Sequence, residues 1–426
     1  MIRILEYGEV PAEEIFARSV PETDVAGTVR AILEDVQKRG NAALLEYTER
    51  FDGVRLAALE VTQEEKATAL SEISPRLREV LERSAANIRR FHEAQRRQSF
   101  VLTDESGVVM GQRIVPVDRA GLYVPGGTAA LASTVLMDVI PAKLAGVPEV
   151  VMVTPPGKDG RIAPAVLAAA QVAGADRIFK VGGAQAVAAL AFGTETIPAV
   201  DKIVGPGNAF VAEAKRQVYG KVSIDMIAGP SEILIVSDGR TDPRWIAADL
   251  LSQAEHDRMA SAVLVTDSGD FALAVQAEIE RQLPLLGREE IARASVEKNG
   301  KIIVTDSLRK AVDVANALAP EHLELCVDDP FALLGSVRHA GSVFLGRYCP
   351  EALGDYLAGS NHTLPTGGTA RFSSPLSVDD FVKKMQYTYY TEAALSRDAA
   401  DVAAFARAEG LEGHARSALA RTEGER

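Results

Sequence analysis

Residues 149–192 read EVVMVTPPGKDGRIAPAVLAAAQVAGADRIFKVGGAQAVAALAF and alternate two kinds of segment. The β-branched runs at 149–154 and 177–181 have the length of buried strands. The Ala-rich segments at 164–173 and 184–192 have helical spacing. Strands and helices that alternate over this distance predict a parallel sheet with helices on both of its faces.

The same alternation of β-branched runs and helical segments continues on both sides of this stretch. Further β-branched runs occur at 233–236, 262–265, 301–304 and 342–345, and a further helical pattern occurs at 208–218. The N-terminal part instead carries three helical patterns, at 25–39, 41–51 and 75–97. The chain as a whole is therefore expected to belong to the α/β class.

Four parts are expected along the chain. The run 124–231 holds several strand–helix units and could close as a compact domain. The segments 23–123 and 232–374 would then form one discontinuous domain into which that run is inserted. Residues 1–22 would be a helical N-terminal extension. Residues 375–426 return to helical spacing and predict a helical tail, which packs on another subunit or folds back on its own chain.

Composition excludes several classes of protein. The 426 residues carry a net charge of −13 and no long basic run, which argues against binding to nucleic acid or to an anionic membrane. No apolar stretch is long enough for a transmembrane helix, and Glu6 comes too early for a signal peptide. Two cysteines, Cys326 and Cys349, indicate a reducing compartment. We expect a cytoplasmic protein.

Four of the six histidines lie in segments rich in polar residues or glycine, namely His256, His322, His362 and His414. A single histidine is more often structural than a ligand, but four in such surroundings favour a site. Gln253 and His256 are three residues apart in a helical pattern and could hold one ion together.

Two more segments pair a carboxylate with an imidazole: Asp355 with His362, and Glu409 with His414. Histidine, aspartate and a neutral oxygen donor form a mixed nitrogen and oxygen set that suits zinc or a similar divalent ion. Manganese and cobalt remain open, and so does a purely structural polar stripe at Gln253 and His256.

Glu321 and His322 precede an apolar run, so we expect them where a loop enters a strand. Adjacent residues there point in different directions and could serve two roles around one substrate. Imidazole can accept a proton from an alcohol near neutral pH, and a buried carboxylate can activate water.

Three glycine-rich turns occur at 123–128, 181–185 and 205–208, and the last two lead into helices. Free backbone amides at such helix starts bind phosphate. The complete GxGxxG pattern is absent, because Phe210 stands where its third glycine would be. Nucleotide binding and tight structural turns both remain open from spacing alone.

Taken together, these segments resemble the histidinol dehydrogenase family. The matching stretches are GLYVPGGTA at 121–129, VGGAQAVAALAFGT at 181–194, VDKIVGPGNAFVAEAKR at 200–216, SIDMIAGPSEILIVSD at 223–238, DLLSQAEHD at 249–257, APEHLEL at 319–325, GDYLAGSNHTLPTGGTARFSSPLSVDDF at 354–381 and EGLEGHA at 409–415. They occur in the family's order from about residue 20 to residue 417. The one departure is SNHT at 360–363, where we expect PNHV, and it leaves the histidine in place.

The resemblance implies an NAD-dependent, zinc-containing homodimer that oxidises L-histidinol to L-histidinal and then to L-histidine. It implies two Rossmann-like domains that lack the usual glycine fingerprint, and a C-terminal tail that completes the site of the partner subunit. It assigns one zinc per subunit to Gln253, His256, Asp355 and His414, and catalysis to Glu321 and His322. It assigns NAD contacts to Tyr123, Gln185 and Asn208, and substrate contacts to Ser231, His362 and Glu409 together with the zinc ligands and His322.

Two other functions remain open at this point. The first is a related zinc and NAD dehydrogenase that acts on another small primary alcohol. The second is a zinc hydrolase in which Glu321 activates water and no nucleotide is needed. A small-molecule binding protein is the weakest alternative, because it leaves Glu321 and His322 without a role.

Overall fold

The computed structural model describes residues 1–18, 24–126 and 131–422. The contacts divide the chain into two compact units, each described here by itself. Unit 1 holds residues 1–95 and 117–381, and unit 2 holds residues 96–116 and 382–426. Some predicted features lie partly outside the described residues. They are the extension 1–22, the domain start at residue 23, the end of the first glycine-rich turn and the end of the tail.

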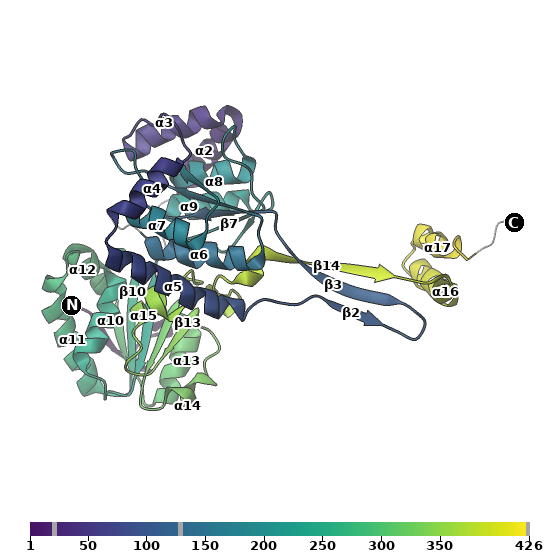
Figure 1. The fold of residues 1–426 in the computed structure, drawn as a ribbon. Helices are drawn as coiled ribbons and strands as arrows, with labels where there is room; N and C mark the ends of the chain where they lie inside the picture. The colour runs from purple at the N-terminus through teal and green to yellow at the C-terminus, as the bar shows by residue number, and fades with distance from the viewer. Residues whose placement is uncertain (19–23, 127–130, 423–426) are drawn as a thin grey trace. The chain divides into compact units, whose positions relative to one another are not determined.

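Unit 1 contains a six-stranded parallel sheet (Figure 1). Its strands, in spatial order, are β1 (Arg3–Glu6), β11 (Lys301–Val304), β10 (Ser261–Thr266), β9 (Glu232–Ser237), β12 (His322–Cys326) and β13 (Ser342–Leu345). The central strands are buried almost throughout, as expected for a parallel sheet that is covered on both faces.

Helices cover both faces of this sheet. One face packs against α10 (Pro243–Ala254), α11 (Gly269–Gln282) and α12 (Glu289–Lys298). The other face packs against α1 (Ala12–Ile15), α13 (Leu308–Leu318) and α14 (Pro330–Leu334). Alternate residues of one strand serve the two cores, since Ile233 and Ile235 face α10 whereas Leu234 and Val236 face α13.

Unit 1 also contains a five-stranded parallel sheet. Its strands, in spatial order, are β6 (Arg177–Lys180), β5 (Glu149–Thr154), β4 (Arg119–Tyr123), β7 (Lys202–Val204) and β8 (Ser223–Ile224). The chain builds outward from β4 to β5 and β6 on one side, then crosses to β7 and β8 on the other. The carboxyl ends of β4 and β7 therefore flank a point where the strand order reverses, which is where open α/β sheets bind ligands.

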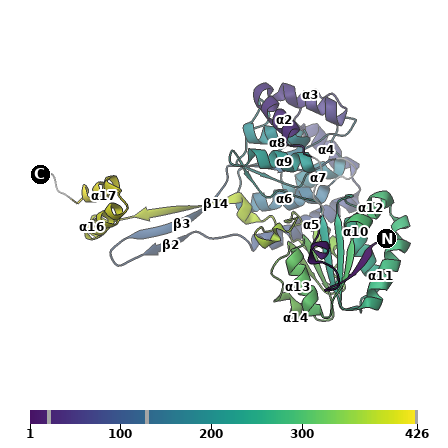
Figure 2. The same cartoon turned by 180° about the vertical axis from the view of Figure 1, so that it is seen from behind.

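Two layers of helices cover each face of the five-stranded sheet. One core joins the sheet to α6 (Ala132–Ala145) and α7 (Pro164–Ala173), and beyond them α4 (Gln63–Glu72) and α5 (Pro75–Glu93). The other core joins it to α8 (Gly183–Phe192) and α9 (Ala209–Val218), and beyond them α2 (Ala26–Arg39) and α3 (Asn41–Asp52) (Figure 2).

The N-terminal helices pack on the five-stranded sheet. The expected domain joined them instead with residues 232–374, which carry most of the six-stranded sheet. Residues 24–93 and β4 were expected to belong with residues 232–374, yet their cores are shared with the five-stranded sheet. Periodicity identifies the apolar face of a helix but not the sheet that this face covers. The domain boundaries themselves stay a prediction.

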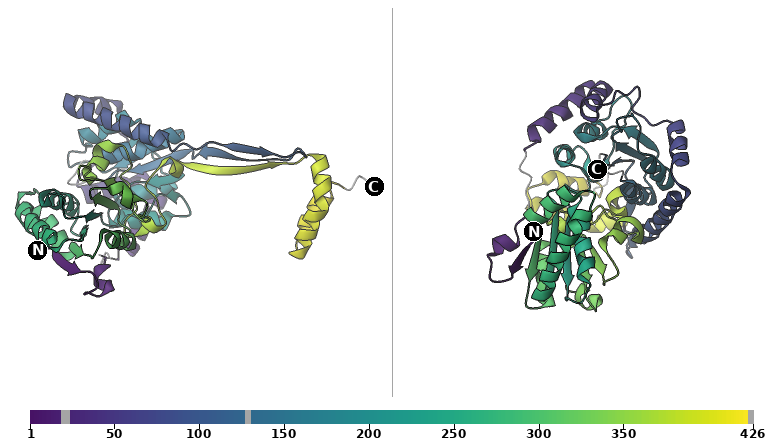
Figure 3. Two further views of the ribbon diagram at one scale, coloured as in Figure 1. Left: turned by 90° about the horizontal axis from the view of Figure 1, so that it is seen from below. Right: turned by 90° about the vertical axis from the view of Figure 1, so that its left-hand side faces the viewer.

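Unit 2 consists of a three-stranded antiparallel sheet and two helices, α16 (Glu392–Ala408) and α17 (Glu412–Leu419). Its strands lie in the order β14 (Val382–Tyr389), β3 (Val109–Pro116) and β2 (Phe100–Thr103), side by side in Figure 3. The expectation that the whole tail is helical was wrong for residues 382–389. Pairing with β3, which lies far away in sequence, gives this Tyr-rich segment its extended form.

The expected N-terminal extension is also only partly helical, because β1 extends the six-stranded sheet beside β11. Among the described residues, no helix is long and apolar enough to cross a membrane.

Candidate functional site

Glu321 and His322 lie where the chain enters β12, as the sequence analysis predicted. The backbone of Glu232 in the neighbouring strand β9 contacts both side chains. The N–H of Glu232 donates to Glu321 Oε2 at 2.9 Å, and its carbonyl oxygen lies 2.9 Å from His322 Nδ1. One residue therefore orients the acid and the imidazole together.

The ring of His322 is buried in its neutral form. The Glu232 carbonyl oxygen can only accept, so we assign the ring proton to Nδ1 and the acceptor role to Nε2. The Gln253 amide, which also contacts Nδ1, must then turn its oxygen rather than its nitrogen towards this proton. Burial lowers the pKa of His322 to about 4. Within the described part of the chain, Nε2 has no hydrogen-bond partner. His322 is thus a neutral base whose lone pair is available.

Two carboxylates complete a compact cluster with this ring. Ligand atoms of His322, Glu351 and Asp355 all lie within 4.8 Å of one another, and Glu351 Oε1 is 3.7 Å from His322 Nε2. Glu351 begins the short helix α15 (Glu351–Leu353), and Asp355 lies in the π-helical turn Gly354–Ala358 that follows. Burial and the nearby Asp355 raise the pKa of Glu351 to about 9.

Sequence reasoning missed Glu351. A usable signal existed, because Glu351 and Asp355 are four residues apart and can share one face of a helical segment. The glycines around Asp355 are more typical of a loop than of a helix, yet the structure has a wide helical turn there.

His362 connects this cluster to the helices of the five-stranded sheet. Its Nδ1 lies 3.5 Å from Asp355 Oδ1, and its Nε2 lies 3.2 Å from the hydroxyl of Thr134 in α6. Burial opposes ionisation of both groups, but the contact between them outweighs it. It lowers the pKa of Asp355 to about 2 and raises that of His362.

Gln253 and His256 lie at the end of α10. The side-chain amide of the buried Gln253 lies 3.0 Å from His322 Nδ1. His256 follows the helix in an exposed turn, so the two do not share a helical face as expected, yet its ring interacts electrostatically with Asp355. Ser231 directly precedes Glu232 in the sequence.

The other two predicted residues, Glu409 and His414, belong to unit 2. Glu409 ends α16, His414 lies in α17, and both are exposed. Unit 1 contains the other seven residues predicted for catalysis, zinc or substrate: Ser231, Gln253, His256, Glu321, His322, Asp355 and His362.

The donor set around His322 suits a divalent cation. Among the described side chains, three buried atoms around His322 have no hydrogen-bond partner: one atom of the Gln253 amide, His322 Nε2 and Glu351 Oε1. The neutral His322 Nε2 can only accept, and Glu351, whose raised pKa keeps it protonated near neutral pH, becomes an acceptor alone when a cation displaces its proton. Buried polar atoms without partners are costly. A cation or a donor on a substrate would satisfy them, and mixed nitrogen and oxygen ligands are typical of zinc sites.

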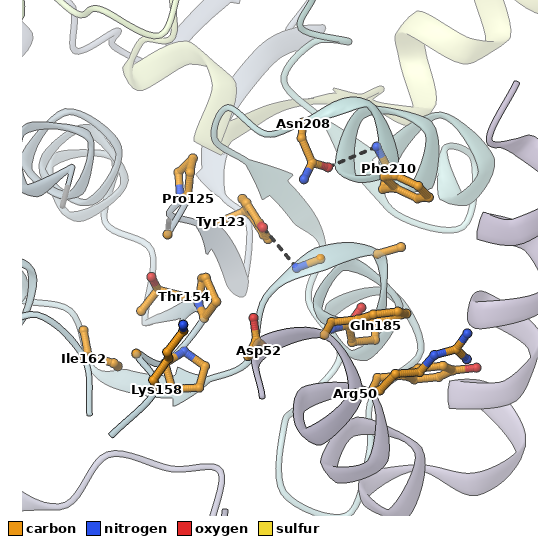
Figure 4. Close-up of a pocket in the computed structure, with 18 of the residues that line it drawn as sticks. Arg50, Asp52, Tyr123, Pro125, Thr154, Lys158, Ile162, Gln185, Asn208 and Phe210 are labelled. Atoms are coloured by element: carbon orange, nitrogen blue, oxygen red, sulfur yellow. Dashed lines mark hydrogen bonds between the residues drawn. The ribbon is translucent and has the colours of Figure 1, made fainter. Parts of the chain in front are cut away.

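A large cavity lies at the carboxyl end of the five-stranded sheet (Figure 4). Its volume is about 1200 Å³, and its lining includes Tyr123, Gln185 and Asn208. Tyr123 ends β4, whereas Gln185 and Asn208 come after β6 and β7, and Tyr123 and Asn208 flank the point where the strand order reverses. Pockets for drug-sized ligands span roughly 300–1,000 Å³, so the volume is sufficient for a dinucleotide.

Hydrogen bonds hold the turns that border this cavity. Gly183 N–H donates to the hydroxyl of Tyr123 at 3.0 Å. The Asn208 side-chain oxygen caps α9 by accepting from Phe210 N–H and Val211 N–H, so its Nδ2 group is left for a ligand. Gly127 and Thr128 of the first glycine-rich turn lie outside the described residues.

Comparison with known proteins gives one consistent result. A family model described as histidinol dehydrogenase matches residues 17–422. The histidinol dehydrogenase of Geobacillus kaustophilus is 57% identical over 392 residues, which cover 92% of this chain and 92% of that protein. That of Syntrophotalea carbinolica is 53% identical over 424 residues, which cover 98% of each. The crystal structure of histidinol dehydrogenase from Elizabethkingia anophelis matches with a TM-score of 0.93 and 37% identity, covering 99% of this chain and 98% of that one.

These matches, together with the two parallel sheets and the buried acid–imidazole pair, define an α/β oxidoreductase. The chain belongs to the histidinol dehydrogenase family. The resemblance drawn from the eight sequence motifs and the expected α/β fold with parallel sheets are both confirmed.

Proposed function

We propose that the protein is a cytoplasmic, zinc-containing homodimer that oxidises L-histidinol to L-histidine through L-histidinal, with NAD as the hydride acceptor. The observation that carries this proposal is the neutral, buried His322 beside Glu321, within a cluster of cation-binding donors. The membership in the family supports the substrate, and the free thiols of Cys326 and Cys349 fit a reducing compartment.

His322 would remove the proton from the substrate oxygen in both oxidations. Its Nδ1 proton is committed to Glu232, so the incoming proton has one place to go, which is Nε2. Because the neutral ring needs no prior deprotonation at working pH, this base is available at once.

Glu321 would act only after the aldehyde has formed, by drawing a proton from the water that adds to it. Burial and the neighbouring carboxylates raise the pKa of Glu321 well above its usual value, and a higher pKa makes the ionised carboxylate a stronger base. The hydrogen bond from Glu232 N–H holds Oε2, which leaves Oε1 for the water.

Gln253, His256 and Asp355 would hold the zinc ion together with His414 of the partner subunit. When bound, the ion would anchor the amine and imidazole of the substrate and, to a lesser extent, polarise its alcohol oxygen. Ser231 and His362 of the same chain and Glu409 of the partner subunit would contact the substrate.

NAD would occupy the cavity of the five-stranded sheet, against Tyr123, Gln185 and Asn208. The helices α8 and α9 begin at the border of this cavity, and their first backbone amides suit the diphosphate.

The homodimer is supported by the surface of unit 2. All four residues of β2 are exposed, including Phe100, Val101 and Leu102, and seven of the eight residues of β14 are exposed as well. A small sheet needs an apolar face covered by another element to be stable. A partner subunit would cover it, and would bring Glu409 and His414 to a site in exchange.

The test is an assay of NADH formation with L-histidinol and with other amino alcohols. The proposal predicts two NADH per histidinol consumed, and little NADH from amino alcohols without the imidazole. A dehydrogenase for another alcohol would reverse this preference, and a zinc hydrolase would form no NADH with any of them.

A further inference from the structure

The cavity of the five-stranded sheet contains one carboxylate that the proposed function does not use. Asp52, the last residue of α3, lines the cavity, and Figure 4 shows its side chain directed into it. Among the described residues, its Oδ2 atom is buried and has no hydrogen-bond partner. Burial raises the pKa of Asp52 to about 6, and its charge in turn acts on the hydroxyl of Tyr123.

A buried acceptor without a partner costs free energy, and a bound ligand that donates to it removes this cost. The ionised carboxylate can only accept, so the matching ligand group is a hydroxyl or an amide N–H. A ribose hydroxyl is the group of NAD that acidic residues bind in other dinucleotide-binding sheets. A phosphate at the same place would meet the carboxylate as a like charge.

The position of Asp52 identifies the end of the dinucleotide that it would contact. Pro125 and Gly126 line the cavity and precede α6, whose Thr134 contacts His362 in the catalytic cluster. The nicotinamide should lie on their side of the cavity, because hydride leaves the substrate beside that cluster. Asp52 belongs to α3, which packs on α8 in the core on the other side of the sheet.

The neighbours of Asp52 suit an adenine base. Tyr47 and Phe51 stack with their ring centroids 5.6 Å apart, and both line the cavity. Arg50 lies over the Phe51 ring at 5.3 Å. Flat aromatic faces with a guanidinium above them bind purines by stacking. The adenosine half of the ligand therefore belongs at the α3 end.

The cavity also contains basic residues, which a phosphate on the adenosine ribose could use. Arg50 and Lys158 are both exposed, so water and salt screen their charges. Arg161 is engaged by two hydrogen bonds to Glu72. The half-buried Asp52 is screened less than either exposed cation, so its repulsion of a phosphate is weakened least by water and salt.

We infer that Asp52 binds the 2′-hydroxyl of the adenosine ribose and makes the protein select NAD over NADP. The inference rests on the proposed use of a nicotinamide dinucleotide, and it adds a selectivity residue to the three expected contacts.

The experiment measures dissociation constants of NADH and NADPH for the full-length protein by nucleotide fluorescence, together with NADH that lacks the adenosine 2′-hydroxyl. The variants are Asp52→Asn and Asp52→Ala. Glu49→Gln, three residues earlier on the exposed face of α3, is the matched control for the loss of one negative charge.

The unaltered protein should bind NADH more tightly than NADPH, and should bind the 2′-deoxy ligand roughly tenfold more weakly than NADH. Asp52→Asn should lower the ratio of the NADPH and NADH dissociation constants by roughly tenfold or more, because it removes the charge, and Asp52→Ala, which also removes the acceptor, should bind NADH and its 2′-deoxy form alike. Glu49→Gln should leave every ratio unchanged. A melting curve for each variant reports folding, and the 2′-deoxy ligand tests the inference on the unaltered chain as well.

Two results would overturn the inference alone: a 2′-deoxy ligand that binds the unaltered protein as tightly as NADH, or folded Asp52 variants whose ratio changes by less than about twofold. If the unaltered protein binds neither NADH nor NADPH, the proposed cofactor fails as well, so the two failures are distinguishable.

Discussion

The backbone carbonyl oxygen of Glu232 lies 2.9 Å from Nδ1 of His322, and this contact determines the chemistry of the ring. It keeps the Nδ1 proton in place and leaves Nε2 as the basic atom, 3.7 Å from Glu351 Oε1. The backbone N–H of the same Glu232 holds Glu321. Two side chains with different proposed roles are thus positioned by one peptide segment of a central strand.

The proposed zinc site predicts that His256→Ala loses most of its metal. His256 is exposed and follows the end of α10, so its removal should leave the fold intact. The measurement is zinc per chain, by elemental analysis after dialysis. His339→Ala is the matched control, because this histidine lies outside the site. Full zinc content in His256→Ala would remove His256 from the ligands.

The proposed exchange of tails predicts complementation between two inactive chains. His322→Ala lacks the base, and His414→Ala lacks a residue of unit 2 that the partner's site would need. A hybrid of the two chains has one site with both groups intact, so mixing after dissociation should restore part of the activity. Verified hybrids without any recovery would mean that each chain builds its own site.

Deletion of the tail is a coarser form of the same experiment. Removal of residues after Pro375 should abolish activity and weaken the dimer, but it also removes Phe381 from a core of unit 1 and β14 from its pairing with β3. The point variants are therefore the sharper test.

The buried Asp138 should make the free energy of unfolding depend on pH. It is fully buried in α6, and burial raises its pKa to about 7. The folded protein thus holds the proton at pH values where the unfolded chain has lost it. The stabilising contribution is complete below the usual aspartate pKa, near 3.8, and is lost as the pH rises towards 7.

Asp138→Asn cannot ionise. The difference between its free energy of unfolding and that of the parent protein should therefore shift in favour of the variant between pH 4 and pH 7, and should stay constant above pH 7. The gain should be of the order of 2–4 kcal/mol, because one unit of pKa corresponds to about 1.4 kcal/mol. Urea unfolding across this range measures it, and Asp118→Asn is an exposed control. A constant difference at all pH values would show that Asp138 ionises alike in both states.

Much of the fold could be predicted from the sequence because buried parallel strands are nearly continuous apolar runs. The run 149–154 and the helix 164–173 agree with β5 and α7 at both ends. Residues 382–389 could not be predicted in this way. They alternate charged, polar and aromatic side chains, and their strand depends on β3, which lies more than 260 residues earlier.

In the site, too, some residues could be placed from the local sequence pattern and others could not. The pair Glu321 and His322 could be placed at the start of a strand, because an apolar run follows them. Glu351 and Asp52 were missed, because their roles depend on long-range packing. Glu351 becomes notable only beside His322, and Asp52 only when α3 packs over the cavity of the five-stranded sheet.

In the proposed mechanism, His322 serves both oxidations, whereas Glu321 serves only the hydration of the aldehyde. General-base assistance is typically worth ~10²–10⁴ in rate, so each loss should be large enough to assign. The most direct measurement follows NADH formation after rapid mixing of zinc-loaded Glu321→Gln with histidinol and NAD. The account predicts a burst of one NADH per site followed by a slow phase, slow conversion of supplied histidinal, and slowing of both stages in His322→Asn. Equal slowing of both stages by Glu321→Gln, with zinc retained, would contradict it.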